Sequence, residues 1–173
     1  IEGPDEGRVK IYGVGVNGLK QPPRSLYLGN SGTAMRLFAG LLAGQSFDTE
    51  LTGDESLSKR PMERVAAPLR LMGAQIESSE GGRPPLKIKG GLALKGIHYD
   101  MPMASAQVKS CLILAGMYAQ GETSVTEPAP TRDHTERMLN GFGYPVQRES
   151  STARIQGGGS LKASKIDVPA DIS

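Results

Sequence analysis

Two short polar turns stand ahead of apolar runs, and their residue types suit the binding of an anion. Ser31-Gly32-Thr33 and Ser105-Ala106-Gln107 each follow a strand-like run and open a stretch with helical spacing. Backbone amides in the first turn of a helix lack partners inside the helix, and the helix dipole adds positive charge there. The same serines would also serve as ordinary N-caps without any ligand. The pattern therefore predicts two helix starts, each a candidate anion site.

A basic residue precedes the next helical run after each of these turns. Arg60 comes just before Pro61, and Arg132 comes just before Asp133. A guanidinium presents a planar fork of donors that fits a phosphate or a carboxylate. Most arginines are solvated surface charges, so each arginine alone is weak evidence, and their recurrence at matching places makes them candidates.

These matching places belong to an internal repeat of about 70 residues. Leu51-Thr52-Gly53 returns as Val125-Thr126-Glu127, and Lys87-Ile88-Lys89-Gly90-Gly91 returns as Arg154-Ile155-Gln156-Gly157-Gly158. The repeat predicts one partial domain over residues 1–173. Residues 25–95 and 96–163 are expected to be two repeat units, residues 1–24 the remnant of an earlier unit, and residues 164–173 the start of a crossover to a further domain.

Each unit reads as β-α-β-α-β-β, which places the chain in the α/β class. The expected strands cover residues 26–29, 49–53, 74–77 and 86–89, then 98–101, 123–126, 146–149 and 153–156, with helices over 32–43, 61–72, 106–119 and 133–141. A strand, helix, strand order of this length predicts a right-handed parallel crossover. Pro61 is expected to be a first helical residue, and Ala34, Leu37, Phe38, Leu41 and Leu42 to form the buried face of the first helix. Residues 8–14 are expected to form a strand left from the earlier unit.

Composition narrows the function classes. The 173 residues carry a net charge of +2, which does not indicate a nucleic-acid surface. The single Cys111 suggests a reducing compartment, and one cysteine with two histidines makes a zinc cluster unexpected. The sequence Gly13 to Gly18 spells G-x-G-x-x-G, but no helical run follows before Pro22-Pro23, so we interpret it as a chance match to the dinucleotide fingerprint. No apolar run has the length of a membrane span.

Four stretches together resemble the 5-enolpyruvylshikimate-3-phosphate synthase family, in the form of its bacterial class II branch. They are Leu28-Gly29-Asn30-Ser31-Gly32-Thr33-Ala34-Met35-Arg36, Asp54-Glu55-Ser56-Leu57-Ser58-Lys59-Arg60-Pro61, Ser105-Ala106-Gln107-Val108-Lys109-Ser110 and Arg132-Asp133-His134-Thr135-Glu136. The resemblance implies part of one globular domain of an inside-out α/β barrel built from β-α-β-α-β-β units. It also implies a cytoplasmic, monomeric transferase of the shikimate pathway of aromatic amino-acid biosynthesis, without a metal or organic cofactor and without nucleic-acid or membrane partners.

The resemblance also implies substrates and residue roles. The family transfers the enolpyruvyl group of phosphoenolpyruvate to shikimate 3-phosphate and releases phosphate. By position in the motifs, Ser105, Ala106, Gln107 and Arg132 are expected to bind shikimate 3-phosphate. Gly32, Arg60 and Gln107 are expected to bind phosphoenolpyruvate, with Asn30 as a further candidate beside Gly32.

The departures from the family pattern point to a fragment. The family's N-terminal Lys-Ser-x-x-x-Arg cluster and its catalytic Asp, Glu and Lys have no counterpart in this sequence, and Asp171 falls where the family's chain crosses to its other domain. We therefore expect the catalytic residues elsewhere in a longer polypeptide, and no turnover by residues 1–173 alone. Three alternatives stay open: an RNA 3′-phosphate cyclase-like protein, although no adenylating histidine motif is visible, a non-catalytic anion- or RNA-binding module, and the enolpyruvyl transferase of cell-wall synthesis.

Overall fold

The computed structural model describes residues 1–168 and contains two four-stranded sheets with the same strand order. The first sheet runs β3-β4-β6-β5 and the second runs β7-β8-β10-β9. Their bounds are β3 Leu26–Tyr27, β4 Thr49–Thr52, β5 Ile76–Ser79, β6 Arg83–Ile88, β7 His98–Asp100, β8 Glu122–Thr126, β9 Val146–Glu149 and β10 Thr152–Gln156. In each sheet the first two strands are parallel and the others pair antiparallel. The predicted parallel crossovers and closing hairpins are therefore confirmed.

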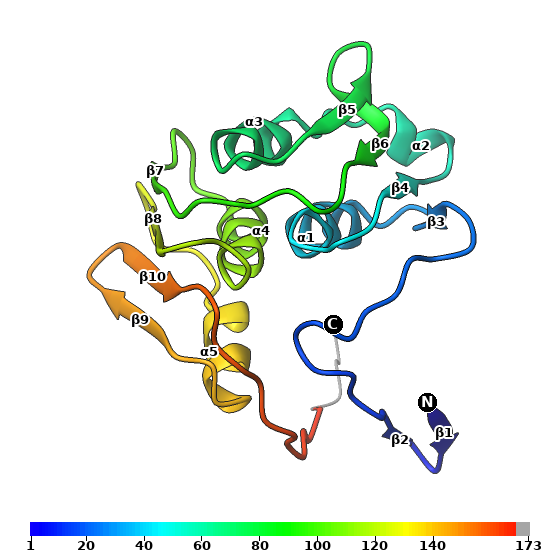
Figure 1. Ribbon diagram of the computed structural model, residues 1–173, viewed down its shortest axis with the longest axis vertical. Coiled ribbons are helices and arrows are strands. Elements are labelled where there is room, and N and C mark those ends of the chain that lie inside the picture. Colours follow the sequence, from blue (N-terminus) through cyan, green and yellow to red (C-terminus); the bar gives the residue numbers. More distant parts are fainter. Residues whose placement is uncertain (169–173) are drawn as a thin grey trace.

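Two of the helices, α1 (Gly32–Ala43) and α4 (Ala106–Gly116), form the centre of the molecule (Figure 1). The other helices are α2 (Glu55–Ser58), α3 (Glu63–Leu71) and α5 (His134–Gly141). Figure 1 shows α1 and α4 side by side in the middle of the molecule, with the strands of both sheets lying outside them. This arrangement confirms the expected α/β class, and the two sheets of this half-domain do not close into a barrel.

A close approach of two backbones sets the contact between α1 and α4. A Cβ atom added to Gly40 would lie 2.1 Å from the carbonyl oxygen of Cys111, so no side chain fits there. The buried face of α1 accordingly consists of Gly32, Met35, Ala39, Gly40, Leu42 and Ala43. The face predicted from spacing is only partly confirmed: Leu42 is buried, Ala34, Leu37 and Leu41 are half-buried, and Phe38 is 40% exposed. Gly40 permits this approach because it has no side chain, and a periodicity of apolar residues does not reveal such a contact.

The start of α3 also differs from the prediction. Pro61 is not a first helical residue, because α3 begins at Glu63 and the short helix α2 occupies part of the preceding loop. The amide of Met62 donates to the carbonyl of Gly82 at 2.7 Å, so the turn between β5 and β6 holds the chain just ahead of α3. This long-range bond has no signature in the local sequence.

The N-terminal segment stands apart from both sheets (Figure 1). β1 (Glu2–Asp5) and β2 (Arg8–Lys10) form a two-stranded antiparallel ribbon, so the strand expected over residues 8–14 is shorter than predicted and β1 was not expected. The G-x-G-x-x-G stretch is irregular, and the first helix after it is α1. Asp171 and the last part of the expected crossover lie outside the described residues.

Candidate anion-binding site

Serine caps define the starts of the two central helices. The Oγ atom of Ser31 accepts from the amide of Ala34 at 3.1 Å, and that of Ser105 accepts from the amide of Val108 at 3.3 Å. The predicted N-caps are therefore confirmed. A serine cap accepts from only one of the four free amides at a helix start. The starts of α1 and α4 therefore retain the positive character that favours an anion.

Gln107 joins these two helix starts. Its Nε2 donates to Thr33 Oγ1 at 2.7 Å, and its Oε1 accepts from Arg36 Nη1 at 2.5 Å. Thr33 and Arg36 lie in the first turns of α1, whereas Gln107 lies in the first turn of α4. The two polar turns recognised in the sequence therefore meet at one place, although they stand in different repeat units.

Arg60 reaches the same place from the loop before α3. Its Nη2 donates to Asn30 Oδ1 at 2.7 Å, and Asn30 Nδ2 donates to Asp54 Oδ2 at 2.9 Å. Asp54 in turn caps α2 by accepting from the amide of Leu57 at 2.8 Å. Hydrogen bonds from Leu57 and Asn30 lower the pKa of the Asp54 carboxyl below its ordinary value. This chain of bonds fixes the direction of the Arg60 guanidinium.

Gly32 lies against two guanidinium groups. A Cβ atom added to Gly32 would lie 3.2 Å from Arg36 Nη1 and 3.4 Å from Arg60 Nη1. Burial, and then the charges of Arg64 and Arg60, lower the pKa of Arg36. Within residues 1–168 none of these three arginines forms an ion pair with a carboxylate. Three cations that repel one another beside two helix N-termini would be stabilised by a bound anion.

The other expected site residues are placed less closely together. Ser105 and Ala106 lie in the turn that begins α4, directly before Gln107. Arg132 is exposed in the loop before α5, and in the described part of the chain no hydrogen bond links it to Ser105 or Gln107. The structure thus brings Gly32, Arg60 and Gln107 together, while the role of Arg132 stays a prediction.

Sequence reasoning missed two of the three clustered arginines and one buried group of charges. Arg36 stood inside a recognised motif without being singled out as a site residue. Arg64 lies in the first turn of α3, where its Nη2 contacts Met103 Sδ at 2.9 Å. Helical spacing offered a signal for Arg36, because a residue four positions after Gly32 lies on the same face of the helix.

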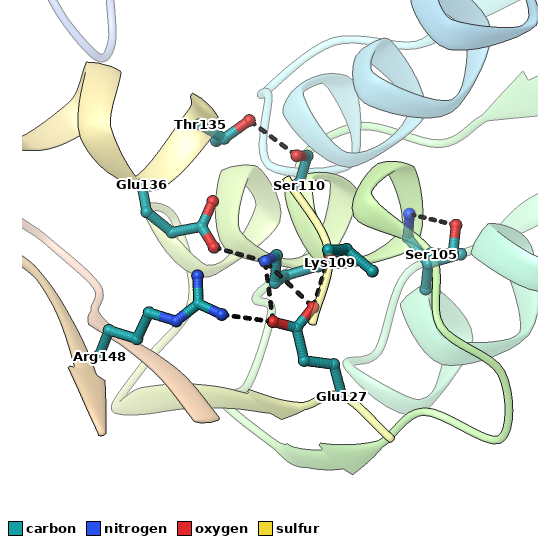
Figure 2. A network of polar contacts seen from close by, with 9 residues as sticks. Ser105, Lys109, Ser110, Glu127, Thr135, Glu136 and Arg148 are labelled. Carbon is teal, nitrogen blue, oxygen red and sulfur yellow. Dashed lines mark hydrogen bonds and ion pairs between the residues drawn. The ribbon is translucent and has the colours of Figure 1, made fainter. Parts of the chain in front are cut away.

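The buried charges are Lys109, Glu127 and Glu136, and the more exposed Arg148 joins them at the edge; the four residues are here called the Lys109 cluster (Figure 2). Lys109 Nζ lies 3.1 Å from Glu127 Oε2 and 2.8 Å from Glu136 Oε1, and Arg148 Nη2 donates to Glu127 Oε1 at 2.7 Å. The side chains of Lys109 and Glu127 are each 1% exposed. A lysine within the apolar run of α4 was the available signal, because a buried charge requires a partner.

Opposing effects set the ionisation of Glu127. Burial raises the pKa of its carboxyl, whereas hydrogen bonds from Thr131 and Lys109 and the charge of Lys109 lower it, and the net result lies below the ordinary value. These contacts therefore favour the ionised form of the Glu127 carboxyl. Within residues 1–168, the cysteine, histidine and acidic side chains form no group of three that could hold a metal ion. None of the helices in that range has the length and apolar character needed to cross a bilayer.

Comparisons with known proteins match this architecture over nearly the whole chain. A protein of Methylococcus capsulatus named 3-phosphoshikimate 1-carboxyvinyltransferase is 68% identical over 173 residues, and one of Hydrogenovibrio crunogenus with the same name is 65% identical over 178 residues. Both alignments cover all of this chain and 40% of the relative. The solved structure of EPSP synthase from Acinetobacter baumannii superimposes with a TM-score of 0.97 at 63% identity, over 99% of this chain and 39% of that one.

The chain thus spans about 40% of the length of the curated relatives that it matches. The family model of EPSP synthase (3-phosphoshikimate 1-carboxyvinyltransferase) matches residues 4–173. Since the motifs, the repeated sheets and the match over residues 4–173 all agree, this chain belongs to the EPSP synthase family.

Proposed function

We propose that the protein containing this chain is a 3-phosphoshikimate 1-carboxyvinyltransferase, and that this chain supplies part of its substrate-binding surface. The reaction would transfer the enolpyruvyl group of phosphoenolpyruvate to shikimate 3-phosphate and release phosphate. One observation carries the proposal: Arg36 and Arg60 lie against Gly32, Arg36 also binds Gln107, and among residues 1–168 neither arginine forms an ion pair with a carboxylate. Both proposed substrates are anions, and such a surface attracts anions.

The proposed division of labour follows the two helix starts. Gly32, Arg60 and Gln107 would hold the phosphate and carboxylate of phosphoenolpyruvate, because the guanidinium forks lie directly over Gly32. Ser105, Ala106, Gln107 and Arg132 would hold shikimate 3-phosphate through the amides at the start of α4 and an arginine fork. Gln107 would touch both substrates, which fits its position between α1 and α4. Asn30 would act on Arg60 rather than on the substrate.

The remaining expectations belong to the same proposal. Groups that move protons are expected in parts of the relatives that this chain does not span, so residues 1–173 alone should release phosphate only at background. Catalysis of this kind needs charges on both sides of a closed site. We also expect a cytoplasmic, monomeric protein that needs no cofactor and binds neither nucleic acid nor membranes. Residues 25–95 and 96–163 would be two repeat units, with residues 1–24 a remnant of an earlier one.

The experiment uses the full-length protein with phosphate release as the assay and calorimetric titration of shikimate 3-phosphate as the binding measurement. Arg132→Ala should weaken that binding by about 1.5–3 kcal/mol, the scale of a hydrogen bond to a charged group. Arg60→Ala should leave it nearly unchanged but raise KM for phosphoenolpyruvate. Two neighbouring cations that pair with nearby carboxylates, Lys59 with Glu55 and Arg137 with Asp133, provide matched control sites.

The controls Lys59→Ala and Arg137→Ala should change neither Kd for shikimate 3-phosphate nor KM for phosphoenolpyruvate appreciably. If Arg60→Ala abolishes the binding of shikimate 3-phosphate and Arg132→Ala does not, the two arginines have been assigned the wrong way round. If the wild-type protein releases no phosphate from the two substrates, the proposed activity is wrong.

A further inference from the structure

The loop that carries Arg132 is tied at both ends to the Lys109 cluster. On one side, Thr131 donates from Oγ1 to Glu127 Oε2 at 2.5 Å. On the other side, Glu136 in the first turn of α5 places its Oε1 2.8 Å from Lys109 Nζ. Figure 2 shows Glu127 and Glu136 on either side of the Lys109 ammonium group. Arg132 therefore stands in a short segment whose two flanks are connected to this one buried group, through Thr131 and Glu127 on one side and through Glu136 on the other.

The same ammonium group belongs to the helix that begins with Ser105. The amide of Lys109 donates to the carbonyl of Ser105 at 3.1 Å, so Lys109 lies one helical turn after the cap. A hydrogen bond also joins α5 to α4 directly, from Thr135 Oγ1 to Ser110 Oγ at 2.7 Å. The turn from Ser105 to Gln107 and the loop of Arg132 are thus connected through one buried side chain.

The cluster is better suited to fixing geometry than to adding stability. Buried ion pairs lose so much hydration that apolar packing of the same volume is often as stable. Glu136 illustrates this, since its side chain is 5% exposed and its two oxygens have no well-aligned hydrogen-bond donor among the described residues, although Lys109 lies close. A buried polar group whose partners all have fixed positions permits few alternative arrangements of the elements around it.

We propose that Lys109, Glu127, Glu136 and Thr131 are positioning residues. They hold Arg132 at a fixed position relative to the Ser105–Gln107 turn. None of the four touches a substrate in this scheme. They act through the main chain, so that the guanidinium of Arg132 and the amides at the start of α4 can bind the same phosphate. This inference rests on the proposed function for the identity of the ligand, shikimate 3-phosphate, but the ordering of the loop can be measured without any ligand.

The first measurement is hydrogen exchange of the ligand-free full-length protein. Thr131→Val removes the hydroxyl that binds Glu127 and keeps the branched shape, whereas Thr131→Ser keeps the hydroxyl. We expect faster amide exchange over residues 128–135 in Thr131→Val and wild-type exchange in Thr131→Ser. Unchanged exchange in Thr131→Val would overturn the proposal, whatever the ligand of the protein is.

The second measurement is calorimetric titration of the same full-length proteins with shikimate 3-phosphate. Thr131→Val should raise Kd about three- to tenfold, from the loss of one hydrogen bond to a charged group that acts only indirectly. Thr131→Ser should restore it, and KM for phosphoenolpyruvate should not change. A variant with reduced thermal stability but an unchanged Kd would show an ordinary structural bond and overturn the proposal.

Two arginines on neighbouring strands give a second, matched pair of variants. Arg148 on β9 pairs with Glu127, and Arg154 on β10 pairs with Glu122, with side chains 34% and 38% exposed. Arg148→Gln should weaken binding of shikimate 3-phosphate, and Arg154→Gln should not. Equal effects of the two variants would contradict the proposal. Failure of the wild-type protein to bind shikimate 3-phosphate would instead refute the proposed function, and the exchange result would still stand for or against the positioning role.

Discussion

Replacing Lys109 by methionine tests how the protein keeps two carboxylates buried beside each other. Met fills a similar volume without charge, so Lys109→Met removes one cation from between Glu127 and Glu136. Glu127 would retain Arg148 at 2.7 Å and the Thr131 hydroxyl at 2.5 Å. Glu136 would lose the only cation that lies within ion-pair distance of it in the described part of the chain. The cost of the substitution should therefore come mainly from Glu136.

The size of that cost follows from protonation. A glutamate has an ordinary pKa of about 4.3 in the unfolded chain. Protonating it at pH 7, so that the folded protein holds a neutral acid, costs about 3.7 kcal/mol at about 1.4 kcal/mol per pH unit. This sets an upper limit on the effect of Glu136, and it agrees with the roughly 3–5 kcal/mol for breaking a buried ion pair. At pH 5.5 the same limit falls to about 1.6 kcal/mol. The destabilisation should therefore shrink as the pH is lowered.

Urea unfolding of the full-length protein at pH 7 and pH 5.5 measures this effect as a shift of the transition midpoint. A second variant, Lys109→Met/Glu136→Met, removes the orphaned carboxylate and should recover most of the lost stability at pH 7. A double variant as unstable as Lys109→Met would refute the reasoning, because the cost would then lie in lost packing rather than in the unpaired charge. A pH-independent cost for Lys109→Met would refute it equally.

Three further outcomes follow from the same contacts. Gly40→Ala should destabilise the protein by about 1–3 kcal/mol or more, measured by urea unfolding, because its Cβ would meet the Cys111 carbonyl 2.1 Å away; a neutral substitution would contradict the close approach of α1 and α4. The folded-state pKa of the Glu127 carboxyl lies below its ordinary value, so the stabilisation it provides is present above that ordinary value and is lost as the pH falls through the folded-state pKa. Glu127→Gln should therefore weaken the loss of thermal stability at acid pH, measured in a thermal unfolding series. Cys111 is fully buried and burial raises its thiol pKa, so a thiol reagent such as dithionitrobenzoate should label it only in urea; rapid labelling of the native protein would contradict its burial.

Local sequence signals predicted the starts of α1 and α4 correctly. The range expected for α1, residues 32–43, is the one observed, because the Ser31 cap and the apolar run both act within a few residues. The strand expected over residues 146–149 also has the range observed for β9. The repeat placed Gly32 and Gln107 at equivalent strand-to-helix junctions, and the structure brings these two junctions together beside Arg60.

Features set by distant contacts were not predictable in the same way. The buried face of α1 depends on how near α4 approaches, and spacing alone assigned Phe38 to the core. The start of α3 depends on a bond to Gly82 across the sheet. The Lys109 cluster joins four elements, and no local pattern states which carboxylates will accompany a buried lysine. Arg64 enters the site only because α3 and the loop before α4 lie side by side.

In the ligand-free protein the side-chain amide of Gln107 already makes two hydrogen bonds, from its nitrogen to Thr33 and from Arg36 to its oxygen. A ligand that binds this amide must displace one of those partners, so the exchange of hydrogen bonds contributes little net enthalpy. What an anion adds is relief of repulsion among the guanidinium groups. Affinity should therefore fall steeply as salt rises, and a neutral analogue of the same shape should bind hardly at all.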